Sequence, residues 1–199
     1  MSRLRVFVDA DCLHKLYLCT FLLTMAGRGH IQFLWTKEVF DETRKSLTSR
    51  FPEDSEKLKR MFDRVMNHFY DNEVRGYEKL IGTLGCRDKD DEHVLAAAIH
   101  GKADVLLTYN TRDFPQELSR NLVVLHPDTF LISWLEANPE LGVYLLAKWM
   151  ERFENPPIVA RAAVDLMNKI DCPMLGSFIG RKAKSINAQI HRLRGADPG

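Results

Sequence analysis

The chain has 199 residues, with 28 Lys and Arg against 27 Asp and Glu, and 45% of its residues are hydrophobic. This composition is typical of a globular protein with a packed core and excludes a disordered chain. The first residues, MSRLRVFVDADCL, hold only a short apolar run that Asp9 and Asp11 interrupt. We therefore expect neither a signal peptide nor a membrane span, and predict a cytoplasmic location.

Strands and helices alternate through the first part of the chain. Residues 4–9, LRVFVD, form a β-branched run that ends at Asp9 and predicts a buried parallel strand. Apolar residues then recur at helical spacing until Gly27, and residues 31–35, IQFLW, predict a second strand. Thr36 is placed to cap a helix over residues 36–47, and Pro52 opens a further helix.

The alternation resumes at residue 88. Residues 88–103, DKDDEHVLAAAIHGKA, begin with acids, continue through an alanine-rich stretch and reach Gly101, which predicts a helix. Residues 105–110 and 121–127 predict strands, and residues 128–138 predict a helix. The order predicts an α/β fold with three layers, α/β/α, around a central parallel sheet.

Three helical stretches without strands follow, over residues 139–153, 156–170 and 174–194. We expect two domains, an α/β domain over residues 1–138 and a helical C-terminal appendage over residues 139–199. The formal charge is −2 in the first part and +3 in the second. Five basic residues of the tail would suit an RNA backbone or an acidic partner, although taken alone they are better explained by a solvated helix face: Arg181, Lys182, Lys184, Arg192 and Arg194.

Several acids are predicted to meet at one edge of the sheet, because the carboxyl ends of parallel strands lie together there. Asp9 and Asp11 end the first strand, Asp91 lies at the start of the 88–103 helix, and Asp113 follows the strand at 105–110. Glu42 reaches the same edge from its helix. Thr108 and Asn110 are small polar groups at the same strand end, placed to hold a water, a phosphate or a carboxylate.

Each acid alone has an ordinary explanation, since acidic residues commonly complement a helix dipole. Gathered together they repel one another, and a hard cation such as Mg²⁺ or Mn²⁺ relieves that repulsion. Such an ion activates water and stabilises a leaving oxygen, so the set predicts hydrolysis of phosphodiesters.

Four segments follow one another in the order seen in PIN-domain proteins of the VapC toxin type: FVDADCL, EVFDETRKSL, DKDDEHVLAAAIHGKADVLLTYNTRDFP and HPDTFL. The chain resembles this family over residues 4–134, and its tail resembles the subset with a helical C-terminal extension. By motif, Asp9 corresponds to the first-strand acid, Glu42 to the helix acid, Asp91 to the third and Asp113 to the fourth. The resemblance implies catalysis by these four and metal binding by Asp9, Asp91 and Asp113.

The resemblance also implies a ribonuclease that uses magnesium or manganese, cleaves RNA and is inhibited by an antitoxin protein encoded nearby. Self-association into a homodimer is left open. The first motif carries Asp11 where the family usually has asparagine, so Asp11 is an additional candidate ligand. Asp88 and Asp90 are further candidates, because they lie so close to Asp91.

Two alternatives compete with a ribonuclease. A haloacid-dehalogenase-like phosphatase also opens with a strand ending in an Asp-x-Asp pair, here Asp9 and Asp11, but the later motifs of that class have no convincing match. A non-catalytic protein with the same fold could instead bind RNA or a partner through the basic tail.

Overall fold

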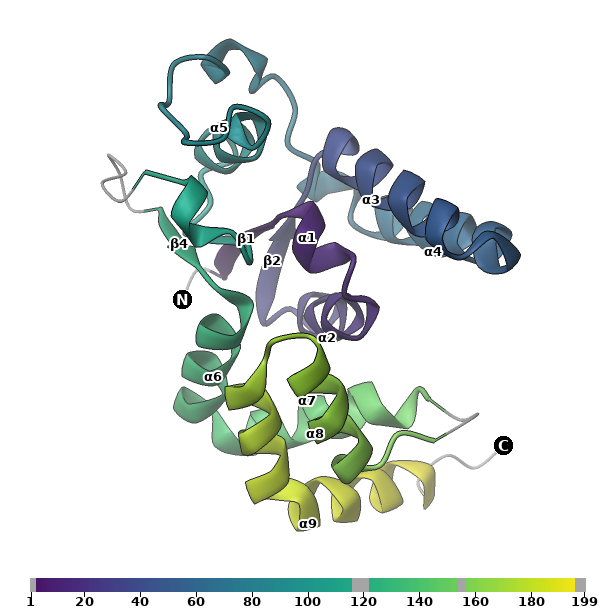
Figure 1. Cartoon of the computed structure of the whole chain (residues 1–199). Coiled ribbons are helices and arrows are strands. Elements are labelled where there is room, and N and C mark those ends of the chain that lie inside the picture. The colour runs from purple at the N-terminus through teal and green to yellow at the C-terminus, as the bar shows by residue number, and fades with distance from the viewer. Residues whose placement is uncertain (1–2, 116–121, 154–156, 196–199) are drawn as a thin grey trace. The chain divides into compact units, whose positions relative to one another are not determined.

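The computed structural model describes residues 3–115, 122–153 and 157–195. Four strands form one sheet in the order β2-β1-β3-β4, and every neighbouring pair is parallel (Figure 1). The strands are β1 (Leu4–Val8), β2 (Ile31–Leu34), β3 (Val105–Leu107) and β4 (Val123–Leu125). Helices flank the sheet and continue as a C-terminal helical region. The predicted α/β fold with a central parallel sheet is confirmed.

The inner strands β1 and β3 are largely buried, as expected for a parallel sheet that helices cover, whereas β4 is exposed or half-buried. The last three residues of β1 and all of β3 are buried, and they are the β-branched and leucine-rich runs visible in the sequence. Residue 121, the first of the expected fourth strand, and residue 156, the first of an expected helix, lie outside the described residues.

The region between the first two strands holds two helices where the sequence predicts one. The helices α1 (Ala10–Leu13) and α2 (Leu16–Gly27) are separated at His14 and Lys15. Asp9 caps α1 with its side chain, so the chain turns into a helix directly at the end of β1.

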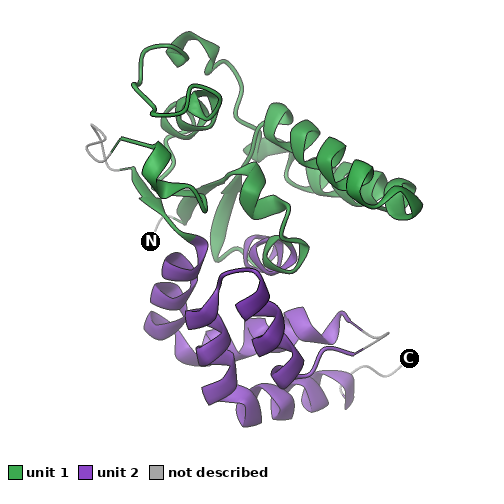
Figure 2. Ribbon diagram, in the orientation of Figure 1, with its two compact units in different colours: residues 1–19, 28–126 green, residues 20–27, 127–199 purple. Residues whose placement is uncertain are grey.

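The chain folds into two compact units, shown in Figure 2: residues 1–19 and 28–126 form the first, and residues 20–27 and 127–199 the second. The first contains the sheet with α1, α3 (Lys37–Arg50), α4 (Ser55–His68) and α5 (Glu92–His100). The predicted Thr36 cap of α3 is present, with the hydroxyl accepting from the Val39 N–H at 3.2 Å. Short 3-10 turns occupy Pro52–Asp54, Tyr70–Asn72, Glu78–Leu80 and Thr111–Asp113.

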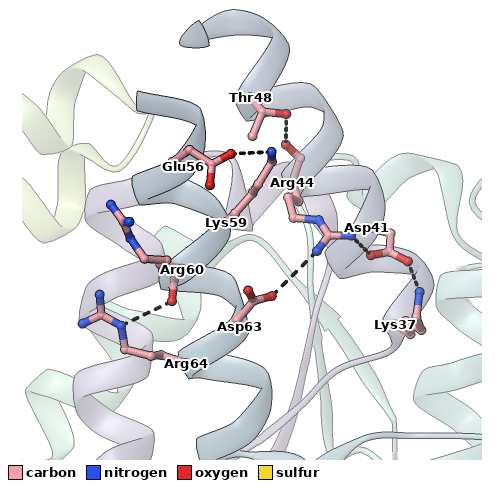
Figure 3. A network of polar contacts seen from close by, with 9 residues as sticks. All are labelled: Lys37, Asp41, Arg44, Thr48, Glu56, Lys59, Arg60, Asp63 and Arg64. Atoms are coloured by element: carbon pink, nitrogen blue, oxygen red, sulfur yellow. Dashed lines mark hydrogen bonds and ion pairs between the residues drawn. The ribbon is translucent and has the colours of Figure 1, made fainter. Parts of the chain in front are cut away.

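An ion-pair network on the exposed side of α3 and α4 links the two helices (Figure 3). Arg44 bonds Asp41 of its own helix at 2.8 Å and faces Asp63 of α4 at 3.8 Å. Lys37 adds a second partner for Asp41. Such exposed pairs contribute little stability each, so the buried apolar faces of the helices account for most of their attachment.

The second unit is helical. It contains the later part of α2 with α6 (Pro127–Ala137), α7 (Pro139–Glu151), α8 (Ala160–Lys169) and α9 (Pro173–Gly195). Asp128 of α6 is buried and accepts from the backbone N–H groups of Met174 and Leu175, which caps α9 from another helix. The sequence assigned α6 to the α/β domain, whereas the structure groups it with α7–α9. The independence of residues 1–138 as a domain stays a prediction.

None of the helices in the described ranges combines the length and apolar character needed to cross a bilayer.

Candidate functional site

The carboxyl edge of β1 and β3 positions the first acids. Val8 pairs with Leu107, and the Asp9 N–H donates to the Leu107 carbonyl at 3.0 Å, so Asp9 and Thr108 leave adjacent strands side by side. Asp9 is only 6% exposed, and its carboxylate accepts from the Ala10 N–H at 2.6 Å. A short hydrogen bond to a helix-starting amide explains how this carboxylate is tolerated inside the fold.

Asp11 is held by the end of β3. Its Oδ2 accepts from the Thr108 hydroxyl at 3.0 Å and from the Tyr109 N–H at 2.8 Å. The Thr108 oxygen in turn accepts from the Asn110 N–H at 3.0 Å. The other oxygen of Asp11, Oδ1, is buried and has no hydrogen-bond partner in the structure. A buried acceptor without a partner is unusual and leaves room for a water or a cation to satisfy it.

The third and fourth acids are brought together by a backbone contact. The Arg87 N–H donates to the Asp113 carbonyl at 2.8 Å, which joins the turn before α5 to the turn after β3. Asp91 is the residue immediately before α5, one position earlier than the first turn predicted for it, and its side chain makes no capping hydrogen bond. The carboxylate of Asp91 therefore has no structural capping role.

Burial and mutual repulsion raise the pKa values of Asp9 and Asp91. The pKa of Asp9 rises to about 7, mainly through burial, then through Asp11 and Asp91, while hydrogen bonds from Thr108 and Ala10 oppose the rise. Burial likewise raises the pKa of Asp91, followed by the charges of Asp88, Asp113 and Asp11. Asp9, Asp11, Asp88, Asp91 and Asp113 thus form one negative cluster, called here the acidic cluster.

Two of the expected residues stand apart from this cluster. Glu42 is exposed on α3, and its charge acts on His14, which also feels Asp11. Asp90 is exposed in the turn before α5, where its N–H donates to Asp88 at 2.9 Å. Asp88 therefore shapes this turn as well as adding charge to the cluster.

His14 and Glu92 are site residues that the sequence did not single out. His14 ends α1, and its Nε2 is buried with no hydrogen-bond partner; burial chiefly lowers its pKa. Glu92 is buried and accepts from the Leu84 N–H at 2.6 Å, a bond that is the main cause lowering its pKa. No periodic sequence pattern singles out His14, because it lies between two helices. Glu92 directly follows Asp91 in the sequence, where it resembles an ordinary surface acid.

The five basic candidates of the tail all lie on α9: Arg181, Lys182, Lys184, Arg192 and Arg194. Arg181 is partly engaged, since it pairs with Glu136 at 3.5 Å and bonds the Ser177 hydroxyl at 2.9 Å. Arg181, Lys184 and Arg192 are exposed and fall on one face of the helix by their spacing.

The carboxylates of the acidic cluster are the side chains that could bind a divalent metal ion. Among the residues that the structure describes, no three Asp, Glu, His or Cys side chains form a group that could hold a metal ion. Mg²⁺ commonly uses one or two carboxylates and several waters, so a smaller set is sufficient. The buried, unpartnered Oδ1 of Asp11 and the mutual repulsion within the cluster fit a hard cation.

Comparison with known proteins agrees with the fold. The sequence matches the PIN domain family over residues 5–112, more than half of the chain, and the chain belongs to that family. It is 30% identical to the putative ribonuclease VapC50 of Mycobacterium tuberculosis (strain ATCC 25618 / H37Rv) over 96 residues, which are 47% of this chain and 56% of the relative. The chain thus spans little more than half of that relative. No solved structure gives a significant match.

The resemblance to VapC-type PIN proteins with a C-terminal helical extension is therefore confirmed. Asp9, Asp11, Glu42, Asp91, Thr108 and Asn110 fall inside the matched range, and Asp113 follows it by one residue.

Proposed function

We propose that this chain is a metal-dependent endoribonuclease and the toxin of a toxin–antitoxin pair. The observation that carries the proposal is the acidic cluster at the carboxyl edge of β1 and β3. Within the described ranges, none of Asp9, Asp11, Asp91 and Asp113 forms an ion pair. Asp9 is buried, and Asp11, Asp91 and Asp113 are half-buried. Carboxylates held close together without a cation repel one another, so a cluster of this kind is explained by a ligand that it binds.

The proposed roles follow the motifs and the geometry. Asp9, Asp91 and Asp113 would bind Mg²⁺ or Mn²⁺, with Asp11 as an additional ligand through Oδ1. When bound, the ion supplies an activated water and stabilises charge on the scissile phosphate and leaving oxygen. Thr108 holds the Asp11 carboxylate in place by its hydroxyl, and Glu42 would orient groups near His14.

The name of the mycobacterial relative, a putative ribonuclease, supports RNA as the substrate. Membership of the PIN-domain family removes the grounds for a dehalogenase-like phosphatase. A protein that binds RNA without cleaving it stays as the competing outcome of the test.

The test is incubation of the purified chain with total cellular RNA in Mg²⁺, in Mn²⁺ and in excess EDTA, followed by mapping of new RNA ends. We expect cleavage with either metal and none with the chelator. Undiminished cleavage in EDTA would show a metal-independent nuclease, and retention of intact RNA on the protein would show a binder.

The toxin assignment has a separate test in cells. Expression of the chain alone should slow growth, and co-expression of the small protein encoded beside it should restore growth. Normal growth at high levels of the folded chain would contradict the assignment. A role of α9 in holding RNA or the antitoxin is part of the same proposal, with Lys184, Arg192 and Arg194 as exposed charges.

A further inference from the structure

A cation and two aromatic rings lie beside the acidic cluster and have no part in the roles proposed above. The Lys15 ammonium lies over the Tyr109 ring, 5.6 Å from its centroid. The rings of Tyr109 and His126 meet edge to face, with centroids 4.7 Å apart and an interplanar angle of 87°. Together they form a row that we call the Lys15–Tyr109–His126 ladder.

The ladder is built from three separate segments that all leave the carboxyl edge of the sheet. Lys15 follows α1, Tyr109 comes two residues after the end of β3, and His126 directly follows β4. The Tyr109 N–H donates to Asp11 at 2.8 Å, so the backbone of Tyr109 is anchored to an acid of the cluster.

The side chains of the Lys15–Tyr109–His126 ladder are of the types that bind single-stranded nucleic acid. Unstacked bases stack on tyrosine and histidine rings, and an ammonium group binds phosphate. All three side chains are partly exposed, which leaves them within reach of a ligand. Lys15 makes no ion pair in the described part of the chain, although several carboxylates lie nearby.

The negative charge of the acidic cluster explains why a cation beside it would help RNA to bind. A phosphodiester that approaches several carboxylates is repelled until a metal ion intervenes, so a neighbouring cation assists its approach. Lys15 is placed to provide this charge, and the two rings are placed to hold a base of the adjoining nucleotide.

We propose that Lys15, Tyr109 and His126 form a nucleotide subsite that holds single-stranded RNA beside the acidic cluster. This inference rests on the proposed function, because it names the part of the site that binds the same substrate. Tyr109 and His126 contact a base, and Lys15 contacts a phosphate of the same strand.

Binding of a labelled single-stranded RNA is measured by fluorescence anisotropy in Mg²⁺, with Asp91→Asn present in every protein so that the RNA stays intact. Tyr109→Leu and Lys15→Met should each weaken binding about tenfold, since base stacking and phosphate contacts have effects of this order. Tyr109→Phe keeps the ring and should bind within about twofold of its parent. Lys57→Met removes an exposed charge from α4 and serves as the matched control for Lys15→Met.

A second series uses RNAs with a single abasic nucleotide moved along the strand. The Tyr109-containing protein should lose affinity at one position, and Tyr109→Leu should lose that sensitivity. In the cleavage-competent chain, Tyr109→Leu should raise KM more than it lowers kcat. Melting temperatures of all variants show whether a loss comes from unfolding, and Lys15→Met keeps the test valid if Tyr109→Leu is unstable.

The outcomes separate this inference from the proposed function. If the chain cleaves RNA while Tyr109→Leu and Lys15→Met bind and cleave as the parent does, the subsite is wrong and the nuclease stands. If RNA binding depends on Tyr109 and Lys15 but no metal-dependent cleavage is found, the subsite stands and the nuclease is wrong.

Discussion

Asp9 and Asp91 experience burial and mutual repulsion at this site, and neither forms an ion pair within the described ranges. Asp9 shows both effects most strongly, with a pKa raised to about 7. Asp91 is a helix-preceding acid whose side chain does not cap its helix. An acid kept for structure would show the reverse, a lowered pKa and hydrogen bonds from the fold, as Glu92 does.

The first prediction concerns substitution of these acids. Asp9→Asn and Asp91→Asn should abolish RNA cleavage, because each removes a proposed ligand. The metal-free variants should be as stable as the parent or more stable, since a charge leaves a crowded cluster. Urea unfolding in EDTA measures this. Variants that unfold well below the parent and still cleave RNA would show that these acids are structural.

The second prediction concerns pH. The pKa of Asp9 is about 7 in the folded protein and near its usual 3.8 when unfolded, so between these values the folded state binds more protons. The stability of the metal-free chain should therefore fall as pH rises from about 4 to about 7. Asp9→Asn should flatten that slope in urea unfolding curves measured in EDTA. Parallel curves for parent and variant would contradict the raised pKa.

Residue identity at the site could be predicted in part from sequence. Asp9, Asp91 and Asp113 stand out because strand ends and helix starts are legible in the hydrophobic pattern, and the structure places all three at one edge. His14 could not be predicted, since it gains its position from a break between α1 and α2 that the continuous apolar periodicity conceals. Tyr109 and Lys15 meet only because β1 and β3 are neighbours, and strand order is not encoded locally.

At the scale of elements, the turn that leads into α5 decides where Asp88 and Asp91 lie. Glu92 fixes this turn from the first residue of the helix, accepting from the Leu84 N–H at 2.6 Å, with Gly82 and Gly85 amides also lowering its pKa. Gly82 and Gly85 both have positive φ, at 85° and 70°, which glycine adopts readily. The loop is thus built around one buried carboxylate.

The third prediction tests that element. Glu92→Ala leaves the Leu84 backbone N–H without its acceptor and should lower the melting temperature of the chain. Cleavage should fall with it, because the loop carries Asp88 and Asp91. Glu92→Gln retains a carbonyl acceptor and should lose less. Glu78→Ala, at an exposed acid of the preceding turn, is the control for thermal unfolding and for activity. Equal stability of Glu92→Ala and Glu78→Ala would refute the role of Glu92.

Most elements could be predicted from their periodicity, and the exceptions have physical causes. The α3 cap at Thr36 and the buried β1 and β3 follow local rules of capping and burial. The predicted helix at residue 88 begins at Glu92 instead, because Asp88 to Asp91 form a turn stabilised by the Asp88 carboxylate. Acidic side chains before a helix accept hydrogen bonds from backbone N–H groups and so favour a turn. The first residue of such a helix is therefore difficult to predict from sequence.

At the scale of the whole molecule, the division into two units depends on packing between residues far apart in the sequence. Hydrophobic periodicity does not predict such contacts. The Trp149 indole of α7 donates to the Thr20 hydroxyl of α2 at 3.0 Å and packs edge to face on Phe21 at 5.7 Å. The later residues of α2 therefore belong with the C-terminal helices, although residues 28–126 lie between them in sequence.

The fourth prediction concerns truncation after Asn138. The fragment 1–138 would expose Phe21 and would leave the buried Asp128 without the Met174 and Leu175 amides that it accepts from. We expect aggregation or a melting temperature clearly below that of the full chain. Size-exclusion chromatography and thermal unfolding decide it. A monodisperse fragment with the parent's melting temperature would show that residues 139–199 are an independent module.

The central claim is that the acidic cluster uses a metal ion to cleave RNA. The most direct measurement is the rate of RNA cleavage by the parent, Asp91→Asn and Asp165→Asn across a Mg²⁺ titration. Asp165 is an exposed acid of α8, so its substitution matches the chemical change away from the cluster. The account predicts Mg²⁺-dependent cleavage by the parent and by Asp165→Asn and none by Asp91→Asn at any Mg²⁺ concentration. Equal rates for Asp91→Asn and Asp165→Asn would contradict it.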